Sequence, residues 1–109
     1  MSTLKIDTDS HEHTLTVRLG GEFDLSGIRD FRRALMDVRA PEVTTVCVDL
    51  RELSFMGASA LRALLDLNNR STRDGFELVV IKGGPLIQRV FEMTGVDARL
   101  ALLEAPPPR

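Results

Sequence analysis

The chain has 109 residues, 43% of them hydrophobic and 28% charged, which is enough apolar side chain for the core of one globular domain. The formal net charge is −2 and the arginines are scattered along the sequence, so the concentrated basic face of a nucleic acid binder is not expected. No apolar run approaches the roughly 20 residues that cross a bilayer, and the start of the chain does not resemble a secretion signal. Because Cys47 is the only cysteine, no intramolecular disulfide can form. We therefore expect a cytoplasmic protein with Cys47 in its core.

The first elements predicted are two strands of a hairpin. Leu15–Leu19 alternates apolar and polar residues, which is the period of a half-buried strand. A shorter extended stretch, Leu4–Asp7, precedes it across the polar residues 10–13. Gly20-Gly21 is expected to end the second strand.

A helix is predicted next. Apolar residues recur at helical spacing from Ser26 to Val38, with arginines on the opposite side. Asp24 or Ser26 could cap the start of this helix, and Ala40-Pro41 is expected to stop it.

Two strand–helix units follow. Residues 43–50 and 76–82 are rich in β-branched or apolar residues, as central strands are. After the first strand comes a helix whose buried stripe consists of Leu61, Leu64, Leu65 and Asn68. The Asp74-Gly75 turn leads into the second strand. The last helix is predicted to begin at Pro85 and to be capped by Gly95.

Residues 100–103 are expected to add an edge strand or a last turn. The order β-β-α-β-α-β-α predicts an α/β fold with a single, largely parallel sheet that begins from a hairpin. We expect one domain over residues 1–105 and a flexible, proline-rich tail over residues 106–109.

Little in the sequence indicates catalysis. His11 and His13 flank Glu12 in a polar turn without further metal-ligating residues, so an exposed loop is favoured over a metal site. Gly83-Gly84-Pro85 lies between a strand and a helix, where backbone amides can meet an anion. It lacks the Lys-Ser/Thr of a phosphate-binding loop and the spacing of a dinucleotide fingerprint. We therefore predict no enzyme activity, no metal and no cofactor, and keep a nucleotide or small-ligand sensor as a third hypothesis.

Three stretches carry a resemblance to a known family: LGGEFDLSGIRDFRRAL (19–35), VCVDLRELSFMGASALRALLDL (46–67) and GFELVVIKGGPLIQRVFEMTGVD (75–97). Their signature residues are Gly21-Glu22-Phe23-Asp24, then Asp49-Leu50 with Leu53, Phe55 and Met56, then Arg89-Val90-Phe91 with Met93 and Gly95. In this order and over nearly the whole chain, they resemble the STAS domain of sulfate transporters and anti-sigma factor antagonists. The resemblance implies a mixed sheet of four or five strands packed with about three to four helices.

A one-domain STAS protein resembles an anti-sigma factor antagonist. Such a protein binds a serine kinase-like anti-sigma factor, frees the sigma factor, and is released when its partner phosphorylates a serine. The family motif at that place is Asp-Ser-Ser/Thr-Gly-Leu, whose first serine accepts the phosphate. The matching residues are Gly57, Ala58, Ser59, Ala60 and Leu61. Because alanine has no hydroxyl, the resemblance implies that phosphorylation control is weak or absent, unless Ser59 has taken over.

The partner-binding surface implied by the resemblance consists of the Gly21–Asp24 loop and residues 55–66, where the helix after the strand at 43–50 begins. Its predicted residues are Gly21, Glu22, Asp24, Phe55, Met56, Gly57, Ala58, Ser59 and Arg62. For Ser59 three roles remain open: a helix cap, an alternative phosphoacceptor or a direct partner contact. Gly57 is expected to supply a tight turn. The oligomeric state stays open between monomer and weak dimer.

An alternative function is a cytoplasmic STAS accessory subunit of a lipid-transporting ABC system. Members of that kind use the fold as a scaffold, which would explain why the usual serine is missing. A transporter ATPase and permease encoded nearby would favour this alternative, and a sigma or anti-sigma factor gene would favour the first hypothesis.

Overall fold

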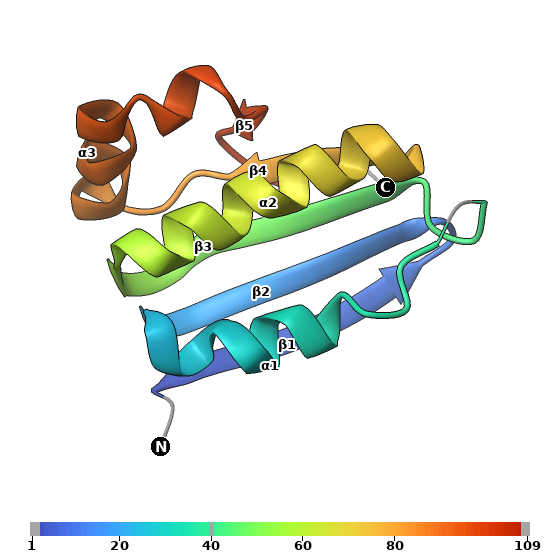
Figure 1. Cartoon of the computed structure of the whole chain (residues 1–109), viewed down its shortest axis with the longest axis horizontal. Helices are drawn as coiled ribbons and strands as arrows, with labels where there is room; N and C mark the ends of the chain where they lie inside the picture. Colours follow the sequence, from blue (N-terminus) through green and yellow to red (C-terminus); the bar gives the residue numbers. More distant parts are fainter. Residues whose placement is uncertain (1–2, 40, 108–109) are drawn as a thin grey trace.

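Five strands form one mixed sheet in which the order across the sheet, β1-β2-β3-β4-β5, is also the order along the chain (Figure 1). The computed structural model describes residues 3–39 and 41–107. The strands are β1 (Leu4–His11), β2 (Thr14–Phe23), β3 (Thr45–Met56), β4 (Glu77–Ile81) and β5 (Leu102–Leu103). The helices are α1 (Ile28–Ala34), α2 (Ala58–Asp74) and α3 (Pro85–Thr94), with 3-10 turns η1 (Leu25–Gly27) and η2 (Val96–Ala98). This confirms the predicted α/β class with a single mixed sheet.

The hairpin is confirmed, but β2 is longer than predicted. β1 pairs antiparallel with β2, and the remaining neighbours pair parallel. Gly20-Gly21 does not end the strand, because the β2–β3 register shifts on either side of Gly20 and Gly21 and pairing then resumes to Phe23. Gly21 has φ +80°, and a Cβ there would collide with the carbonyl oxygen of Thr3. The two glycines therefore accommodate a bulge that carries β2 on to the site described below.

Helix α1 is shorter than the predicted Ser26–Val38 segment. A 3-10 turn precedes it, and the helix ends at Ala34. The carbonyl oxygens of Leu35 and Val38, which no longer take part in a helix, accept hydrogen bonds from the Arg70 guanidinium at 2.7 and 2.9 Å. Of the predicted stop at Ala40-Pro41, Ala40 lies outside the described residues. A side chain from α2 thus replaces the helical hydrogen bonds that the periodicity of this segment predicts.

The two later helices end as predicted. Gly75 and Gly95 cap α2 and α3 with φ of +82° and +77°, the left-handed conformation that glycine adopts without a Cβ penalty. Pro85 occupies the first turn of α3. β3 reaches Met56, six residues beyond the predicted end at Leu50, and its extension carries the chain to the start of α2.

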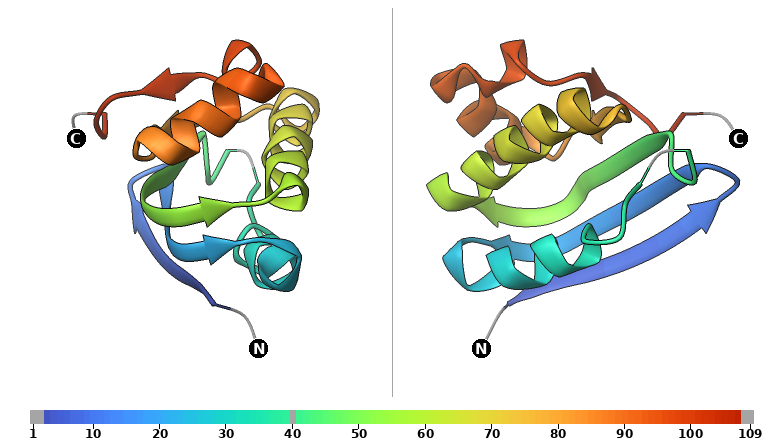
Figure 2. Two further views of the ribbon diagram at one scale, coloured as in Figure 1. Left: turned by 90° about the vertical axis from the view of Figure 1, so that its left-hand side faces the viewer. Right: turned by 45° about the vertical axis from the view of Figure 1, so that its right-hand side comes forward.

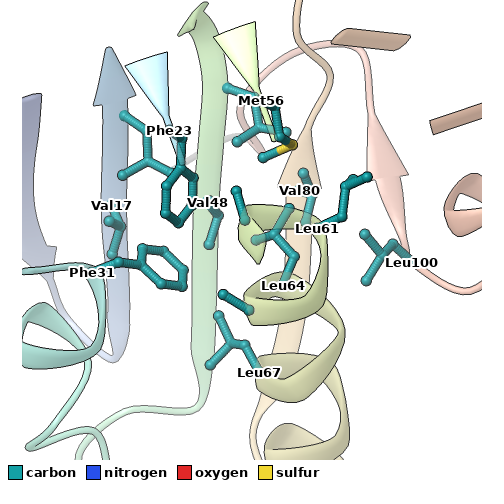
Figure 3. Close-up of a cluster of buried hydrophobic side chains, with 14 of the residues drawn as sticks. Val17, Phe23, Phe31, Val48, Met56, Leu61, Leu64, Leu67, Val80 and Leu100 are labelled. Atoms are coloured by element: carbon teal, nitrogen blue, oxygen red, sulfur yellow. The ribbon is translucent and has the colours of Figure 1, made fainter. Parts of the chain in front are cut away.

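The core fills the space between the sheet and the helices. The two views of Figure 2 place α1 and α2 on the same face of the sheet. Between them and the strands lie fully buried side chains, among them Phe23 of β2 and Phe31 of α1, whose ring centroids are 5.0 Å apart (Figure 3). Leu61, Leu64 and Leu67 of α2 complete this layer. Leu61 and Leu64 were predicted, whereas the predicted Leu65 and Asn68 are only partly buried and Leu67 was missed. None of the helices in the described part of the chain is long and apolar enough to cross a membrane.

The opposite face of the sheet has a smaller buried cluster of Cys47, Val79 and Ile81. Burial raises the pKa of the Cys47 thiol, so this cysteine is the inert core residue that the sequence predicted. Beside it lies a cavity of about 190 Å³, lined in part by Pro106 and Pro107. The remainder of the predicted tail, residues 108–109, lies outside the described residues.

Asp49 is the one charged side chain buried within the described residues, and it lies on this second face. Burial alone would raise its pKa, but hydrogen bonds from the guanidinium and backbone N–H of Arg51 outweigh burial. The pKa of Asp49 is therefore lowered. The guanidinium of Arg51 donates hydrogen bonds of 2.8–3.2 Å to both carboxylate oxygens of Asp49, so the buried charge is paired.

Candidate functional site

The candidate site lies where β2 and β3 end side by side and α2 begins. Parallel strands bring their carboxyl ends to one edge of a sheet, so the loop after Phe23 meets the junction after Met56. The N–H of Gly57 donates to the carbonyl oxygen of Phe23 at 2.9 Å and so joins the end of β2 to the β3–α2 junction. Residues 24–27 and the first turn of α2 therefore form one surface, which we call the junction site.

Ser59 is not the cap of α2. Gly57 occupies the N-cap position, with φ −87° and ψ 175°, and Ser59 is the second residue of the helix. The Ser59 hydroxyl instead donates to Oδ1 of Asp24 at 3.1 Å. The prediction of a serine cap is wrong because β3 continues to Met56, leaving only Gly57 between strand and helix. Ser59 ties α2 to the loop after β2.

Gly57 makes room for a neighbouring side chain and does not form a tight turn. Its backbone is extended, a conformation open to any residue. A Cβ built on it would lie 2.7 Å from Cγ of Asp24 and nearer still to Oδ1. The Asp24 carboxylate thus fills the space that a side chain at position 57 would need.

The other predicted residues divide into exposed and buried ones. Phe55 is 47% exposed at the end of β3, opposite Glu22 of β2. Ala58 and Arg62 are exposed on α2. Met56 is 3% exposed and lies in the core (Figure 3), so it offers no surface to a partner. Gly21 is half-buried in the bulge of β2, where its role is conformational.

Sequence reasoning missed Leu25 and Arg32. Both line a hollow of about 440 Å³ at the junction site, together with Ala58, Ser59 and Arg62. Leu25 is 75% exposed. Leu25 lies three residues before Ile28 and is in phase with the buried stripe of α1, so helical periodicity predicts that its side chain is buried. The 3-10 turn η1 breaks that phase, and the local structure that turns Leu25 outward left no signal in the sequence.

The sites that the sequence disfavoured also have structural explanations. His11 belongs to β1, and His13 lies in the hairpin turn with its Nδ1 3.2 Å from the carbonyl oxygen of Glu42. No cluster of three His, Cys, Asp or Glu side chains suited to a metal occurs in residues 3–39 and 41–107. A Cβ at Gly83 would lie 2.8 Å from Cβ of Ile87, so close packing of α3 accounts for this glycine.

A sequential five-stranded mixed sheet with a junction site at the start of α2 defines an α/β domain of the STAS type. The family model described as "Mlab, STAS domain" matches residues 6–104, and the chain belongs to the STAS domain family. The predicted resemblance is confirmed.

Two curated relatives similar to this chain are anti-sigma factor antagonists. The anti-sigma F factor antagonist of Paenibacillus polymyxa is 30% identical over 95 residues, which cover 85% of this chain and 80% of that protein. The anti-sigma-B factor antagonist of Staphylococcus aureus is 25% identical over 93 residues, covering 85% and 86%.

Among solved structures, an anti-sigma factor antagonist from Mycobacterium paratuberculosis superposes with a TM-score of 0.82 at 22% identity, over 94% of this chain and 86% of that one. At this identity the likeness shows the fold.

Proposed function

We propose that this protein is an anti-sigma factor antagonist that binds an anti-sigma factor through the junction site and thereby frees a sigma factor. The observation that carries the proposal is the exposed hollow at the start of α2, at the position where the STAS motif has its regulated serine. Leu25, Arg32 and Arg62 are among its lining residues, and the Leu25 side chain is 75% exposed. An exposed apolar side chain beside arginines is the composition of a binding hot spot.

Regulation by phosphorylation is weak or absent in this proposal. Ala58 has no oxygen to accept a phosphoryl group. The Ser59 hydroxyl donates to Asp24. A phosphate on Ser59 would add about −1.5 to −2 of charge beside the Asp24 carboxylate, which repels it. The protein therefore stays in its binding form, and Ser59 serves as a structural tie. We propose that it acts in the cytoplasm.

The other hypotheses gain no support. The named relatives given above are antagonists, and nothing in them favours an accessory subunit of a lipid transporter. Of the two glycines that motivated a ligand sensor, Gly83 has the packing explanation given above.

A pull-down from the native host tests the proposal. The bait is the tagged protein, compared with Leu25→Asp and with the matched control Leu86→Asp, which changes a 71% exposed leucine on α3. We expect an anti-sigma factor, identified by mass spectrometry, to be captured by the wild type and by Leu86→Asp, and to be reduced at least about tenfold by Leu25→Asp. Capture that is equal for all three baits, or absent, contradicts the proposal.

Intact-mass measurement after incubation of the complex with Mg-ATP tests the regulation. We expect no added phosphate on the wild type. Ala58→Ser restores a hydroxyl at the family position and serves as the comparison variant. Stoichiometric phosphate on Ser59 of the wild type would refute the unregulated form of the proposal.

A further inference from the structure

The hollow at the junction site continues along α2. A second hollow, also about 440 Å³, shares Arg32 and Ala63 with the first and reaches Arg73 near the end of the helix. The two together form one groove between α1 and α2, which lie beside each other on the same face of the sheet (Figure 1). We call it the α1–α2 groove. The 17 residues of α2 span about 25 Å at a rise of 1.5 Å per residue, which is the length of a helix of about four to five turns.

The groove is basic in a chain whose formal net charge is −2. Four arginines line it, and the one acid among its lining residues is Asp66. They are Arg32, Arg62, Arg70 and Arg73. Arg32 comes from α1 and the other three from α2, about 30 residues or more further along the chain. Folding brings them to the same groove.

Two of these arginines have no acid within salt-bridge distance anywhere in residues 3–39 and 41–107. Arg70 and Arg73 both hold Asp74 at 3.2 Å, so one carboxylate serves two guanidinium groups. Arg32 and Arg62 have no such counterpart, so the walls of the groove keep an excess of positive charge. Uncompensated charge along a groove steers and selects a partner of opposite sign.

The width of the groove is held by a fixed contact. Phe31, Leu35 and Leu67 lie beneath the inner part but are nearly fully buried, so they belong to the core and offer little surface to a partner. The guanidinium of Arg70 bonds the carbonyl oxygens of Leu35 and Val38, and so ties the end of the α1 segment to α2. A groove of this length with arginines along its walls is suited to an acidic helix.

We infer that the α1–α2 groove docks an acidic helix of the anti-sigma factor, so that the partner contacts the length of α2 and not the junction site alone. The inference rests on the proposed function and adds the chemistry of the partner's contact segment. Carboxylates of the docked helix face Arg32 and Arg62. Asp66, midway along the groove, opposes this charge pattern and weakens the complex.

Asn69 is the position at which to test this inference. It lines the groove, is exposed, and makes no side-chain hydrogen bond within the described residues, so its replacement breaks no contact. It lies ten residues along α2 from Ser59, away from the junction site. Isothermal titration calorimetry with the anti-sigma factor captured above compares Asn69→Lys, Asn69→Glu and Asp66→Asn with the wild type. Arg89→Glu, a charge reversal at an exposed site on α3, is the control.

For an acidic partner helix we expect Asn69→Glu to weaken binding about fivefold or more, and Asn69→Lys and Asp66→Asn to tighten it about threefold. Raising the salt concentration reduces these differences. Arg89→Glu stays within about twofold of the wild type. Melting temperatures of the free variants verify that each is folded.

Each of the other outcomes contradicts a specific part of the inference or of the proposed function. If neither Asn69 variant changes the affinity, the partner does not occupy the groove, while the junction site and the proposed function stand. If Asn69→Lys weakens and Asn69→Glu tightens binding, the docked segment is not acidic. If the wild type binds no anti-sigma factor, the proposed function itself is refuted.

Discussion

Replacing Gly57 by alanine tests how the loop after β2 and the start of α2 are fitted together. A Cβ at this position would lie 2.7 Å from Cγ of Asp24 and 3.2 Å from its Oδ2. The backbone at residue 57 is extended, so alanine adopts it without strain. The carboxylate of Asp24 must therefore move, and its hydrogen bond with the Ser59 hydroxyl is lost.

The expected loss of stability is about 1–1.5 kcal/mol. An alanine N-cap costs up to about 1 kcal/mol relative to glycine, but alanine also restricts the unfolded chain by about 0.4–1 kcal/mol, and these two effects largely offset each other. What remains is the hydrogen bond from Ser59 to a charged carboxylate, worth about 1.5 kcal/mol at most at an exposed site. For a chain of this size the melting temperature falls by about 4–6 °C.

A double-mutant cycle with Asp24→Ala isolates the steric cause. Asp24→Ala removes the carboxylate atoms that the new Cβ meets, and it also removes the acceptor of the Ser59 bond. In the Asp24→Ala background the new Cβ meets no carboxylate, so Gly57→Ala is expected to change the free energy of unfolding by less than about 0.5 kcal/mol. Urea unfolding followed by far-UV circular dichroism measures all four variants.

An equal cost of Gly57→Ala with and without Asp24 would refute this reasoning. Glycine at position 57 would then be required by the cap or the backbone, not by the neighbouring carboxylate.

Three further changes test other parts of the structure. Because the pKa of Asp49 is lowered in the folded protein, its stabilisation is complete above the ordinary aspartate pKa near 4 and is lost as the pH falls through the folded-state value. Asp49→Asn is therefore expected to cost about 1–3 kcal/mol at pH 7 and less at pH 3 in urea titrations, and equal losses at both pH values would contradict this. Gly21→Ala is expected to lower the melting temperature by several degrees, since it meets Thr3 and imposes φ +80° on alanine, whereas Gly20→Ala, in ordinary contact distance of 3.5 Å from Glu52, is the milder control. Phe31→Ala removes a 1% exposed ring that packs on Phe23 and is expected to cost about 3–5 kcal/mol by calorimetry, while Met36→Ala, at a 65% exposed side chain, should cost less than about 0.5 kcal/mol.

The fold could be predicted from the sequence because local signals and burial agree over most of the chain. The alternation in β2, the buried run of β3 and β4, and the Pro85 and Gly95 signals each specify their element without help from distant residues. The end of α1 could not be predicted in this way. Its hydrophobic period continues to Val38, but the hydrogen bonds of this segment go to Arg70, more than 30 residues away.

The place of the junction site in the chain could be predicted from its motif, but the contacts between its residues could not. The sequence predicts that Ser59 lies just after β3. It does not predict the hydrogen bond from Ser59 to Asp24, because these residues are 35 positions apart in the chain. Gly57 was read as a turn because sequence reasoning cannot see a carboxylate that arrives from another strand. Of the groove arginines only Arg62 was predicted to bind the partner, because charge that is scattered in the sequence becomes clustered only by folding.

The agreement of strand order with chain order has a consequence for how the molecule opens. Each new strand is added beside the previous one, so β2, β3 and β4 are flanked on both sides while β1 and the two-residue β5 are the edges. Native-state amide hydrogen exchange should therefore be graded, slowest in the centre of β3 and fastest at β5, with the C-terminal edge detaching below the free energy of global unfolding. The junction site depends on β2 and β3, so it should stay intact while that edge frays, and a partner bound there would meet a prearranged surface.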